Sequence, residues 1–388
     1  MRVVHLGKYY PPSPGGIESH TRTLALAQAH CGAEVRVLVV NHATANEWDA
    51  TFCPWQPTER REETDGSVRV LRIARLANIA RLDIAPGLLT ALRQLLRWQP
   101  DIWHLHTPNI TMLLGVLACP AIRPLVITHH SDIIRQRFLK HMIRPLEAAV
   151  YRRAARVLPT SLAYVEGSGL LRQFTDRISA LPLGIDLEPF RTPTPAAQTY
   201  ARELRTRYGS PLWLCVGRLI YYKGLHVALE ALRRVSGTLV VIGTGPLEAD
   251  LRAKAAKLGL ADRVVFHGHA TPEQLVGAYH AATALWFPSV ARSEGFGLVQ
   301  VEAMASGCPV INTAIPGSGV PWVCRHEQEG LTVPVNDPTA LAAAADRLLT
   351  EPGLRDRLAA AGRLRAATEF DHRVMAERSL AIYRDVLS

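Results

Sequence analysis

The chain has 388 residues, 48% of them hydrophobic and 20% charged, so it can bury more than one core and is not disordered. Its formal net charge of +10 permits phosphorylated substrates, an anionic membrane or nucleic acid as partners, without choosing among them. The sequence has no run of about 18 apolar residues, no pattern of a secretory signal and no CxxC spacing of cysteines. We therefore expect a cytoplasmic protein with reduced cysteines, at most peripheral on the inner face of the cell membrane.

The N-terminal half alternates short β-branched runs with helical patterns. The sequence predicts strands at 2–7, 34–40, 101–106 and 124–130 and helices at 17–31 and 86–98. This alternation is typical of parallel sheets with crossover helices.

The alternation restarts after a stretch rich in proline and threonine, 191–199, which we interpret as a linker. The second half has strand patterns at 211–217, 238–245, 263–268, 284–288 and 308–312. The economical architecture is an α/β chain of two doubly wound, Rossmann-like domains, 1–187 and 188–370, facing each other across a cleft. We expect the final segment, 371–388, to be helical.

Two glycine-rich turns come after predicted strands. The first, PPSPGGIE, contains Gly15 and Gly16, whose exposed amides could meet a phosphate. The second, GTGPLE at 243–248, lacks the third glycine of a dinucleotide fingerprint. The sequence therefore does not favour NAD as a cofactor.

Histidines gather at two predicted strand ends. THHSDI places His129 beside Asp132, a candidate polar contact or acid–base pair, and His106 shares a strand face with His104. With His130 these four histidines raise a zinc hypothesis, but they lack a fixed carboxylate partner and the signal is weak. We expect no metal site, and for His104 a core position with a hydrogen-bond partner.

The segment 135–157 carries seven cations and only Glu147 as an acid, and its first part is amphipathic. A basic amphipathic helix fits an anionic membrane surface or a lipid pyrophosphate, although a solvated helix face is an equally simple reading. Nucleic-acid binding is disfavoured, because only Phe138 and Tyr151 are aromatic there.

The loop GRLIYYKG, 217–224, follows a predicted strand. Arg218 and Lys223 would lie at the carboxyl edge of a parallel sheet, where two cations suit a diphosphate.

The stretch SEGFGLVQVEAMASG, 293–307, places Glu294 in a glycine-rich turn and Glu302 about one turn into the helix that follows. The amino end of a helix favours anions and oxygen-rich ligands, and the glycines favour close approach by a ligand.

Together these stretches resemble the retaining, nucleotide-sugar-dependent glycosyltransferases of family 4 (group 1), which have the GT-B fold. The resemblance is carried by PPSPGGIE, THHSDI, GRLIYYKG and EGFGLVQVEAMASGCPVI, in that order over nearly the whole chain. It implies that the helix at 371–388 crosses back onto the N-terminal domain.

The resemblance also implies residue roles. Glu294 and His129 would contact the donor sugar at the reacting centre, and Glu302 would bind the ribose. The remaining implied contacts are Arg218, Lys223, Gly15 and Gly16 on the diphosphate, the backbone of Phe296, Gly297 and Leu298 on the donor, and Asp132 and His106 on the acceptor or sugar. No metal or other cofactor is implied, since two cations and helix N-termini can neutralise a leaving diphosphate.

The softer resemblance is to bacterial mannosyltransferases of O-antigen assembly. It implies GDP-mannose or a related GDP-hexose as donor, with UDP-sugars as the alternative, and a polyprenyl-pyrophosphate-linked oligosaccharide as acceptor. Rival functions are a non-catalytic nucleotide-sugar or nucleic-acid-binding protein, and an epimerase or phosphorylase of the same architecture. A glycosidase is disfavoured, because the cationic pair would then have no purpose.

Overall fold

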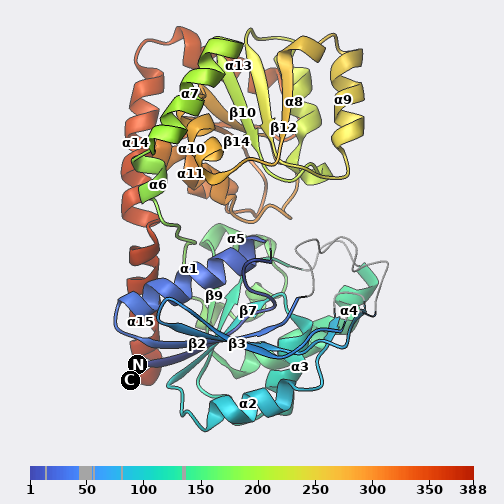
Figure 1. Cartoon of the computed structure of the whole chain (residues 1–388), viewed down its shortest axis with the longest axis vertical. Helices are drawn as coiled ribbons and strands as arrows, with labels where there is room; N and C mark the ends of the chain where they lie inside the picture. The colour runs from blue at the N-terminus through green and yellow to red at the C-terminus, as the bar shows by residue number, and fades with distance from the viewer. Residues whose placement is uncertain (14, 43–54, 56, 80–81, 133–136) are drawn as a thin grey trace. The chain divides into compact units, whose positions relative to one another are not determined.

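The computed structural model describes residues 1–13, 15–42, 55, 57–79, 82–132 and 137–388 (Figure 1). The chain divides into two compact units. The first comprises Met1–Ile185 together with His372–Ser388, and the second comprises Asp186–Asp371. Within the described residues, no helix is both long enough and apolar enough to cross a membrane.

The first unit is built on a seven-stranded sheet in the order β3-β4-β2-β1-β7-β8-β9, with a separate β5-β6 hairpin. Every neighbouring pair in the large sheet is parallel except β3 and β4 at the edge. Its strands are β1 Arg2–Leu6, β2 Glu34–Val40, β3 Arg61–Asp65, β4 Val68–Ile73, β5 Ala77–Ile79, β6 Leu82–Ile84, β7 Ile102–Thr107, β8 Leu125–His129 and β9 Ala154–Pro159. Its helices are α1 Gly16–His30, α2 Leu88–Leu96, α3 Ile110–Ala118, α4 Arg137–Arg153, α5 Leu162–Gly167 and α15 His372–Leu387.

Both faces of this sheet are buried, and strand alternation divides the core in two. On β1, Val4 packs on the side of α2 and α3, whereas Val3 packs on the side of α1 and α15. Because side chains alternate along a strand, His5 shares the second face with Val3. The central strand therefore carries a fully buried histidine on the face covered by α1 and α15.

The last helix, α15, belongs to the first unit and lies along α1 (Figure 1). Its Ser379 and Tyr383 accept hydrogen bonds from Nε2 of Gln28 on α1, at 2.8 and 3.0 Å. The amide N–H of His372 donates to the carbonyl of Ile185 at 3.0 Å, so the two points where the chain passes between the units are hydrogen-bonded together.

The second unit has a six-stranded sheet in the order β12-β11-β10-β13-β14-β15, parallel throughout. Its strands are β10 Leu212–Val216, β11 Thr238–Ile242, β12 Val264–Gly268, β13 Ala284–Phe287, β14 Val310–Thr313 and β15 Gly330–Val333. Its helices are α6 Glu188–Arg191, α7 Pro195–Tyr208, α8 Leu225–Leu232, α9 Glu248–Lys257, α10 Pro272–Ala281, α11 Leu298–Ser306, α12 Val320–Val323, α13 Pro338–Thr350 and α14 Leu354–Glu369. The stacked rings of Trp213 and Trp286 lie at the centre of its core.

Two sequence interpretations are wrong in detail. The predicted linker 191–199 is largely helical: Thr194 accepts a side-chain hydrogen bond from the amide N–H of Ala197, and Pro195 occupies the first turn of α7. Proline and threonine are favoured at a helix start, so their enrichment marked a capped helix rather than a linker. The segment 135–157 is not one helix either, because α4 ends at Arg153 and β9 follows.

Candidate active site

In the second unit, the loops after β10 and β13 meet at the carboxyl edge of the sheet. The two strands are parallel neighbours, so both chains leave the sheet on the same side. Gly224 has a left-handed φ of 65°, and a Cβ there would lie 1.9 Å from the Pro288 carbonyl oxygen. Only glycine allows the two loops to approach this closely.

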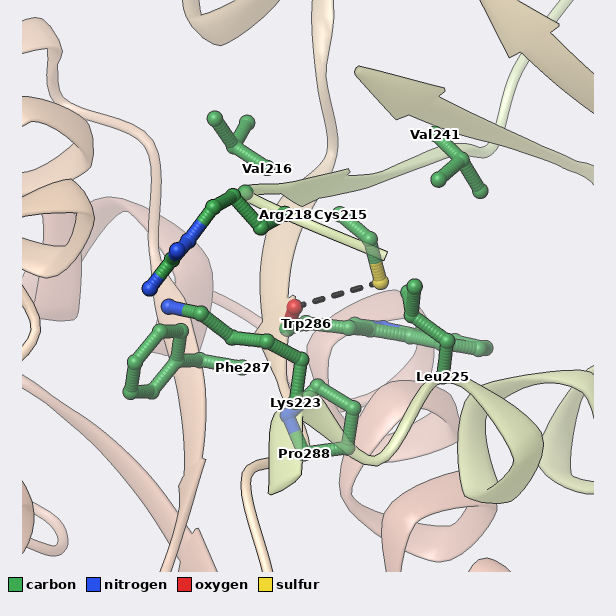
Figure 2. A pocket seen from close by; sticks show the side chains of 10 residues that line it. Cys215, Val216, Arg218, Lys223, Leu225, Val241, Trp286, Phe287 and Pro288 are labelled. Carbon is green, nitrogen blue, oxygen red and sulfur yellow. Dashed lines mark hydrogen bonds between the residues drawn. The ribbon is translucent and has the colours of Figure 1, made fainter. Parts of the chain in front are cut away.

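A small pocket opens at this edge. Its lining includes Gly217, Arg218, Lys223 and Phe287, and Figure 2 shows the ends of the Arg218 and Lys223 side chains on the same side of it. The Lys223 ammonium lies 5.1 Å from the centre of the Phe287 ring. The structure therefore brings the two predicted phosphate-binding cations to one pocket.

The first acid of the predicted pair, Glu294, contacts Lys223, which lines this pocket. Its Oε2 lies 2.5 Å from Lys223 Nζ, with side-chain exposures of 11% and 15%. Ser289 Oγ donates a longer hydrogen bond of 3.5 Å to the same oxygen. A carboxylate this buried needs a positive partner, and Lys223 supplies it.

The helix α11 begins directly after the glycine-rich turn. Gly297 precedes it with φ of 79°, and a Cβ there would lie 2.6 Å from Cζ of Phe287. The Phe296 side chain is 4% exposed and packs against Trp322 and Phe370. Phe296 can therefore offer a ligand only its backbone, as the sequence interpretation specified.

The second acid, Glu302, is partly buried on α11. Burial raises its pKa, while a hydrogen bond from Tyr279 and the charge of Lys223 act in the opposite direction. The Tyr279 hydroxyl donates to Oε2 at 2.7 Å. Within the described part of the chain only Oε2 is engaged, so Oε1 can still accept from a ligand hydroxyl.

In the first unit, His129 ends β8 beside Asp132, and the two side chains are 2% and 9% exposed. Its Nε2 lies 3.2 Å from Asp132 Oδ1, and its Nδ1 lies 2.7 Å from the Tyr151 hydroxyl. Ser168 Oγ donates to Asp132 Oδ1 at 2.8 Å. Tyr151 therefore orients the ring through Nδ1, whereas Nε2 has no hydrogen-bond partner among the described residues although Asp132 Oδ1 is near.

The neighbouring histidines point to the other face of the sheet. His5, His104, His106 and His130 share the face under α1 and α15, and α1 adds His20. We call these five residues the histidine cluster: His5, His20, His104, His106 and His130. His104 has two hydrogen-bond partners, Tyr383 and Thr128, as expected for a core histidine.

Strand alternation therefore divides the predicted set of four histidines. His106 lies 3.2 Å from His130, measured from Nδ1 to Nε2, and does not join the His129–Asp132 pair. The zinc hypothesis as drawn from sequence grouped His129 with residues of the opposite face, because adjacent residues on a strand point in opposite directions.

The glycine pair before α1 is only partly open. Residue 14 lies outside the described residues. A Cβ on Gly15 would lie 2.0 Å from Oε2 of Glu18, so the Glu18 carboxylate covers that glycine. A Cβ on Gly16 would meet nothing within 4 Å, which leaves room for a ligand beside Gly16.

Cations of the basic segment also serve the fold. Arg153 donates to the carbonyls of Val116 and Cys119, and Arg144 donates to the carbonyl of Gly169 at 2.9 Å. Arg135 and the side chains up to residue 142 lie outside the described residues. A membrane-facing role thus rests on fewer cations than the sequence count suggested.

Comparisons with known proteins define the class. Residues 14–189 match the family described as Glycosyltransferase Family 4, and residues 197–365 match Glycosyl transferases group 1. The D-rhamnosyltransferase WbpZ of Pseudomonas aeruginosa is 32% identical over 354 residues, 91% of this chain and 87% of the relative. The O-antigen chain mannosyltransferase C of Escherichia coli is 29% identical over 389 residues, 100% and 99% of the two chains. The chain therefore belongs to the glycosyltransferases of family 4, group 1.

Solved structures agree on the fold. The sucrose-phosphate synthase of Thermosynechococcus elongatus aligns with a TM-score of 0.77 at 23% identity, over 99% of this chain and 98% of the other. Anabaena HepE in complex with UDP aligns with 0.76 at 19% identity, over 99% and 100%. The predicted GT-B architecture of two Rossmann-like halves is confirmed.

Sequence reasoning missed several residues of the site. Tyr279 lies on α10, outside every motif, and reaches Glu302 only through the packing of α10 against α11. His20 is an isolated histidine within an ordinary helical pattern. Helix periodicity could have predicted that His20 is buried, because it lies one turn before Leu24 and so shares the buried face of α1.

The histidine cluster predicts a steep acid sensitivity of the first unit. Burial lowers the pKa of His5 to about 4 and of His20 to about 3, and lowers those of the other three well below 6.5. Below pH 6.5 the unfolded chain therefore binds protons that the folded unit does not, and stability falls as pH falls. Each histidine contributes about 1.4 kcal/mol per pH unit in that window.

Because all five pKa values are lowered, their effects act in the same direction, and we expect the stability of the first unit to fall steeply as the pH falls below about 6.5. Urea titrations in EDTA at steps from pH 7.5 to pH 4.5 measure this. Constant stability between pH 6.5 and 5 would contradict it.

Proposed function

We propose that the chain transfers a hexosyl group, with retention, from a nucleoside diphosphate sugar to a lipid-linked oligosaccharide during synthesis of a bacterial surface polysaccharide. The donor we propose is GDP-mannose or a related GDP-hexose. The observation that carries this proposal is the contact between Lys223 and Glu294 in a pocket that Arg218 also lines. It joins a cation suited to phosphate and an acid suited to a sugar hydroxyl.

The donor diphosphate is the proposed partner of Arg218 and Lys223. A nucleoside diphosphate leaves with its negative charge, so it needs neutralisation rather than a proton. Lys223 has three donors and can bind phosphate while it keeps its contact with Glu294. The amino end of α11 and Gly16 are the further proposed contacts, and the transfer is proposed to need no metal.

Glu302 is the proposed ribose ligand. The Tyr279 hydroxyl donates a hydrogen bond to one carboxylate oxygen of Glu302. The other oxygen would accept a hydrogen bond from a ribose hydroxyl. The backbone of Gly297 and Leu298 at the start of α11 is proposed to add contacts to the donor. In this proposal Glu294 contacts the sugar and Glu302 contacts the ribose, which would explain why the two acids lie eight positions apart on either side of a helix start.

The choice of sugar rests on the relatives. One is named a D-rhamnosyltransferase and the other a mannosyltransferase. D-Rhamnose is 6-deoxy-D-mannose, so the two sugars share the manno configuration and differ only at C6. We therefore propose a manno-configured donor sugar for this chain, and leave the substituent at C6 open.

His129 and Asp132 are the proposed polar contacts of the sugar and acceptor side. In the proposed path the acceptor hydroxyl attacks the anomeric carbon from the face that the diphosphate leaves. The leaving phosphate oxygen takes the acceptor proton, so no protein base is required. His129, oriented by Tyr151, would hold a sugar hydroxyl through its Nε2 during the step.

The proposed acceptor is an oligosaccharide on polyprenyl pyrophosphate, which would place the enzyme peripherally at the cytoplasmic face of the membrane. Support comes from the similarity to the O-antigen chain mannosyltransferase of Escherichia coli and from the net charge of +10.

The donor class is tested first by thermal unfolding in EDTA with GDP, UDP and ADP and their sugars. A ligand at 100 times its dissociation constant adds about 2.7 kcal/mol of stability, which raises the melting temperature measurably. We expect a shift with GDP compounds, and transfer from a GDP-sugar that survives EDTA. A shift with UDP compounds alone would select the UDP-sugar alternative. No shift with any nucleotide, together with salt-dependent retention on DNA, would favour a nucleic-acid-binding protein.

Lys223→Met should weaken nucleoside diphosphate binding by roughly tenfold or more, because a hydrogen bond to a charged group contributes about 1.5–3 kcal/mol. Calorimetric titration with GDP measures the loss. Lys254→Met is the matched control, since Lys254 is also ion-paired, with Glu230 at 3.0 Å. Equal GDP affinity in Lys223→Met and the parent would remove Lys223 from the diphosphate site.

Glu294→Gln keeps the side-chain shape but removes the charge beside Lys223. We expect initial transfer rates to fall about 100-fold or more, the scale seen when one oriented electrostatic group is lost from a reacting centre. The melting temperature should fall, because Lys223 loses its charged partner, so rates are compared at a temperature where both proteins are folded. Glu230→Gln is the control, and parent-like turnover in Glu294→Gln would sink the assigned role.

A further inference from the structure

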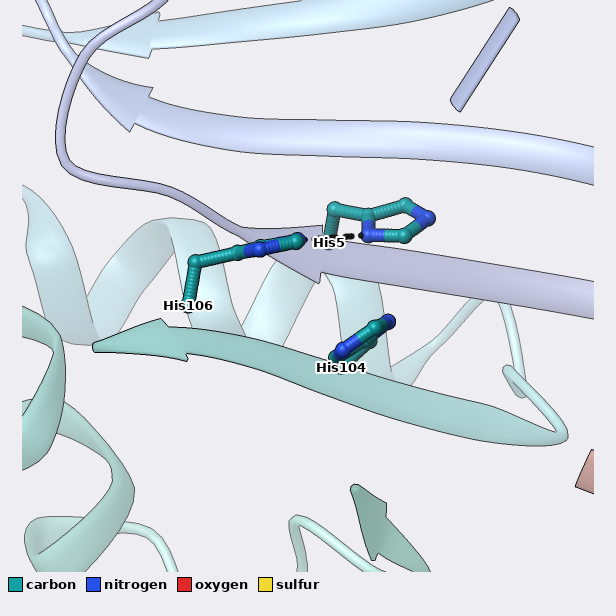
Figure 3. Close-up of side chains that lie close together, drawn as sticks. All are labelled: His5, His104 and His106. Atoms are coloured by element: carbon teal, nitrogen blue, oxygen red, sulfur yellow. Dashed lines mark hydrogen bonds between the residues drawn. The ribbon is translucent and has the colours of Figure 1, made fainter. Parts of the chain in front are cut away.

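The histidine cluster contains two groups of three histidines whose ring nitrogens lie within 4.8 Å of one another. The first is His5, His104 and His106, which Figure 3 shows on β1 and β7. The second is His20, His106 and His130, on α1, β7 and the end of β8. Hydrogen bonding decides which of the two has lone pairs to offer a metal ion.

Hydrogen bonds that begin at Ser379 on α15 determine which ring nitrogens of His5 and His106 carry a proton. Ser379 Oγ donates to the Ala376 carbonyl at 2.7 Å, so it accepts from Gln28 Nε2. The amide of Gln28 is thereby oriented, and its Oε1 lies 2.8 Å from His5 Nε2. A carbonyl oxygen only accepts, so His5 Nε2 carries the proton and His5 Nδ1 is a lone pair.

The chain of hydrogen bonds continues to His106. His5 Nδ1 lies 3.0 Å from His106 Nε2, the contact drawn as a dashed line in Figure 3. Because His5 Nδ1 accepts, His106 Nε2 donates, and His106 Nδ1 carries a lone pair. Nε2 of His130 donates to that lone pair at 3.2 Å in the metal-free protein. A metal ion bound here would replace this hydrogen bond, with the His130 proton moving from Nε2 to Nδ1.

The group of His5, His104 and His106 is satisfied by these bonds. Both nitrogens of His5 are used, by Gln28 and His106. Both nitrogens of His104 are used too, by the Tyr383 hydroxyl at 2.5 Å and by Thr128 Oγ1 at 2.6 Å. This group has no lone pair free for a metal.

The group of His20, His106 and His130 differs in one respect. His20 is 2% exposed, and among the described residues neither of its ring nitrogens has a hydrogen-bond partner. A buried imidazole without a partner is costly, and native structures usually satisfy it with water or an ion. Its ring packs edge-on to those of His106 and His130, at 5.7 and 4.9 Å between centres.

One pair of nitrogens in this group has the spacing of metal ligands, and a ring nitrogen of His20 lies within 4.8 Å of both. Tetrahedral zinc holds nitrogens at about 2.0–2.1 Å, which places two ligand nitrogens about 3.3 Å apart. The 3.2 Å between His106 Nδ1 and His130 Nε2 matches that separation. His5 and Gln28 would then orient His106 from behind, as outer hydrogen bonds orient metal-bound histidines elsewhere.

We propose that His20, His106 and His130 bind a divalent transition-metal ion of the zinc class through three imidazole nitrogens. The fourth position would take water or an anion, which offsets the buried positive charge. The 9% exposure of His130 provides access from solvent. The ion would tie α1 to the ends of β7 and β8, and it is assigned no part in the sugar transfer.

The experiment uses the full chain without a histidine tag, stripped with EDTA and exchanged into metal-free buffer. Titration with Co²⁺ should give saturable visible d–d absorption, which Zn²⁺ then displaces at one ion per chain. Zn²⁺ should also raise the melting temperature. A parent protein that takes up neither ion would overturn the proposal.

His20→Phe keeps an aromatic ring, slightly larger than imidazole, and removes no hydrogen bond, so the variant should fold, which circular dichroism checks. It should lose the Co²⁺ absorption and the Zn²⁺ stabilisation. His130→Gln is a second variant with the same expected loss, and His30→Ala, exposed on the same helix, should bind as the parent does. Parent-like Co²⁺ spectra in both His20→Phe and His130→Gln would refute the site.

Discussion

The parallel pairing of neighbouring strands is the constraint on which both halves of the molecule depend. In the second unit β10 and β13 run side by side in the same direction, so their two following loops must leave at one edge. Gly224 lets those loops touch, and Lys223 and Glu294 meet as a result. The same constraint in the first unit brings the ends of β7 and β8 together, with their histidines.

The contact between Lys223 and Glu294 buries two charges and also fixes the position of both side chains. Two charged side chains this buried lose hydration, and each is tolerable there because the other is present. The same pairing holds the two groups in place relative to each other. Under the proposed function, a cation and an acid that are already positioned would need little rearrangement when a diphosphate and a sugar enter, which is how electrostatic stabilisation becomes effective in catalysis.

The first unit uses buried polar groups in a different way. The histidine cluster lies in its core, and a run of hydrogen bonds from Ser379 through Gln28 and His5 leads to His106. Such a network specifies one arrangement of the helices, because each donor fits only one acceptor. The helix α15, which follows the whole second unit in the chain, is thereby fastened to α1 by specific polar contacts as well as by apolar packing.

Much of the fold was readable from the sequence, because strands buried on both faces appear as continuous apolar runs. The expected strand at 34–40 matches β2 residue for residue, and the other predicted strands agree with the structure to within a few residues. The edge strand β3 was missed because its sequence, REETD, is charged, and β9 was missed because it follows a basic helix without a turn signal.

The sequence by itself determined the family, since the spacing of Glu294 and Glu302 and the order of the motifs are properties of the chain alone. Only the tertiary structure decided which side chains meet. It paired Lys223 with Glu294 and Tyr279 with Glu302, and it separated His129 from His130. The physical reason is that hydrogen bonds and ion pairs form between residues far apart in sequence, so their partners follow from strand order, helix packing and the face on which each side chain lies.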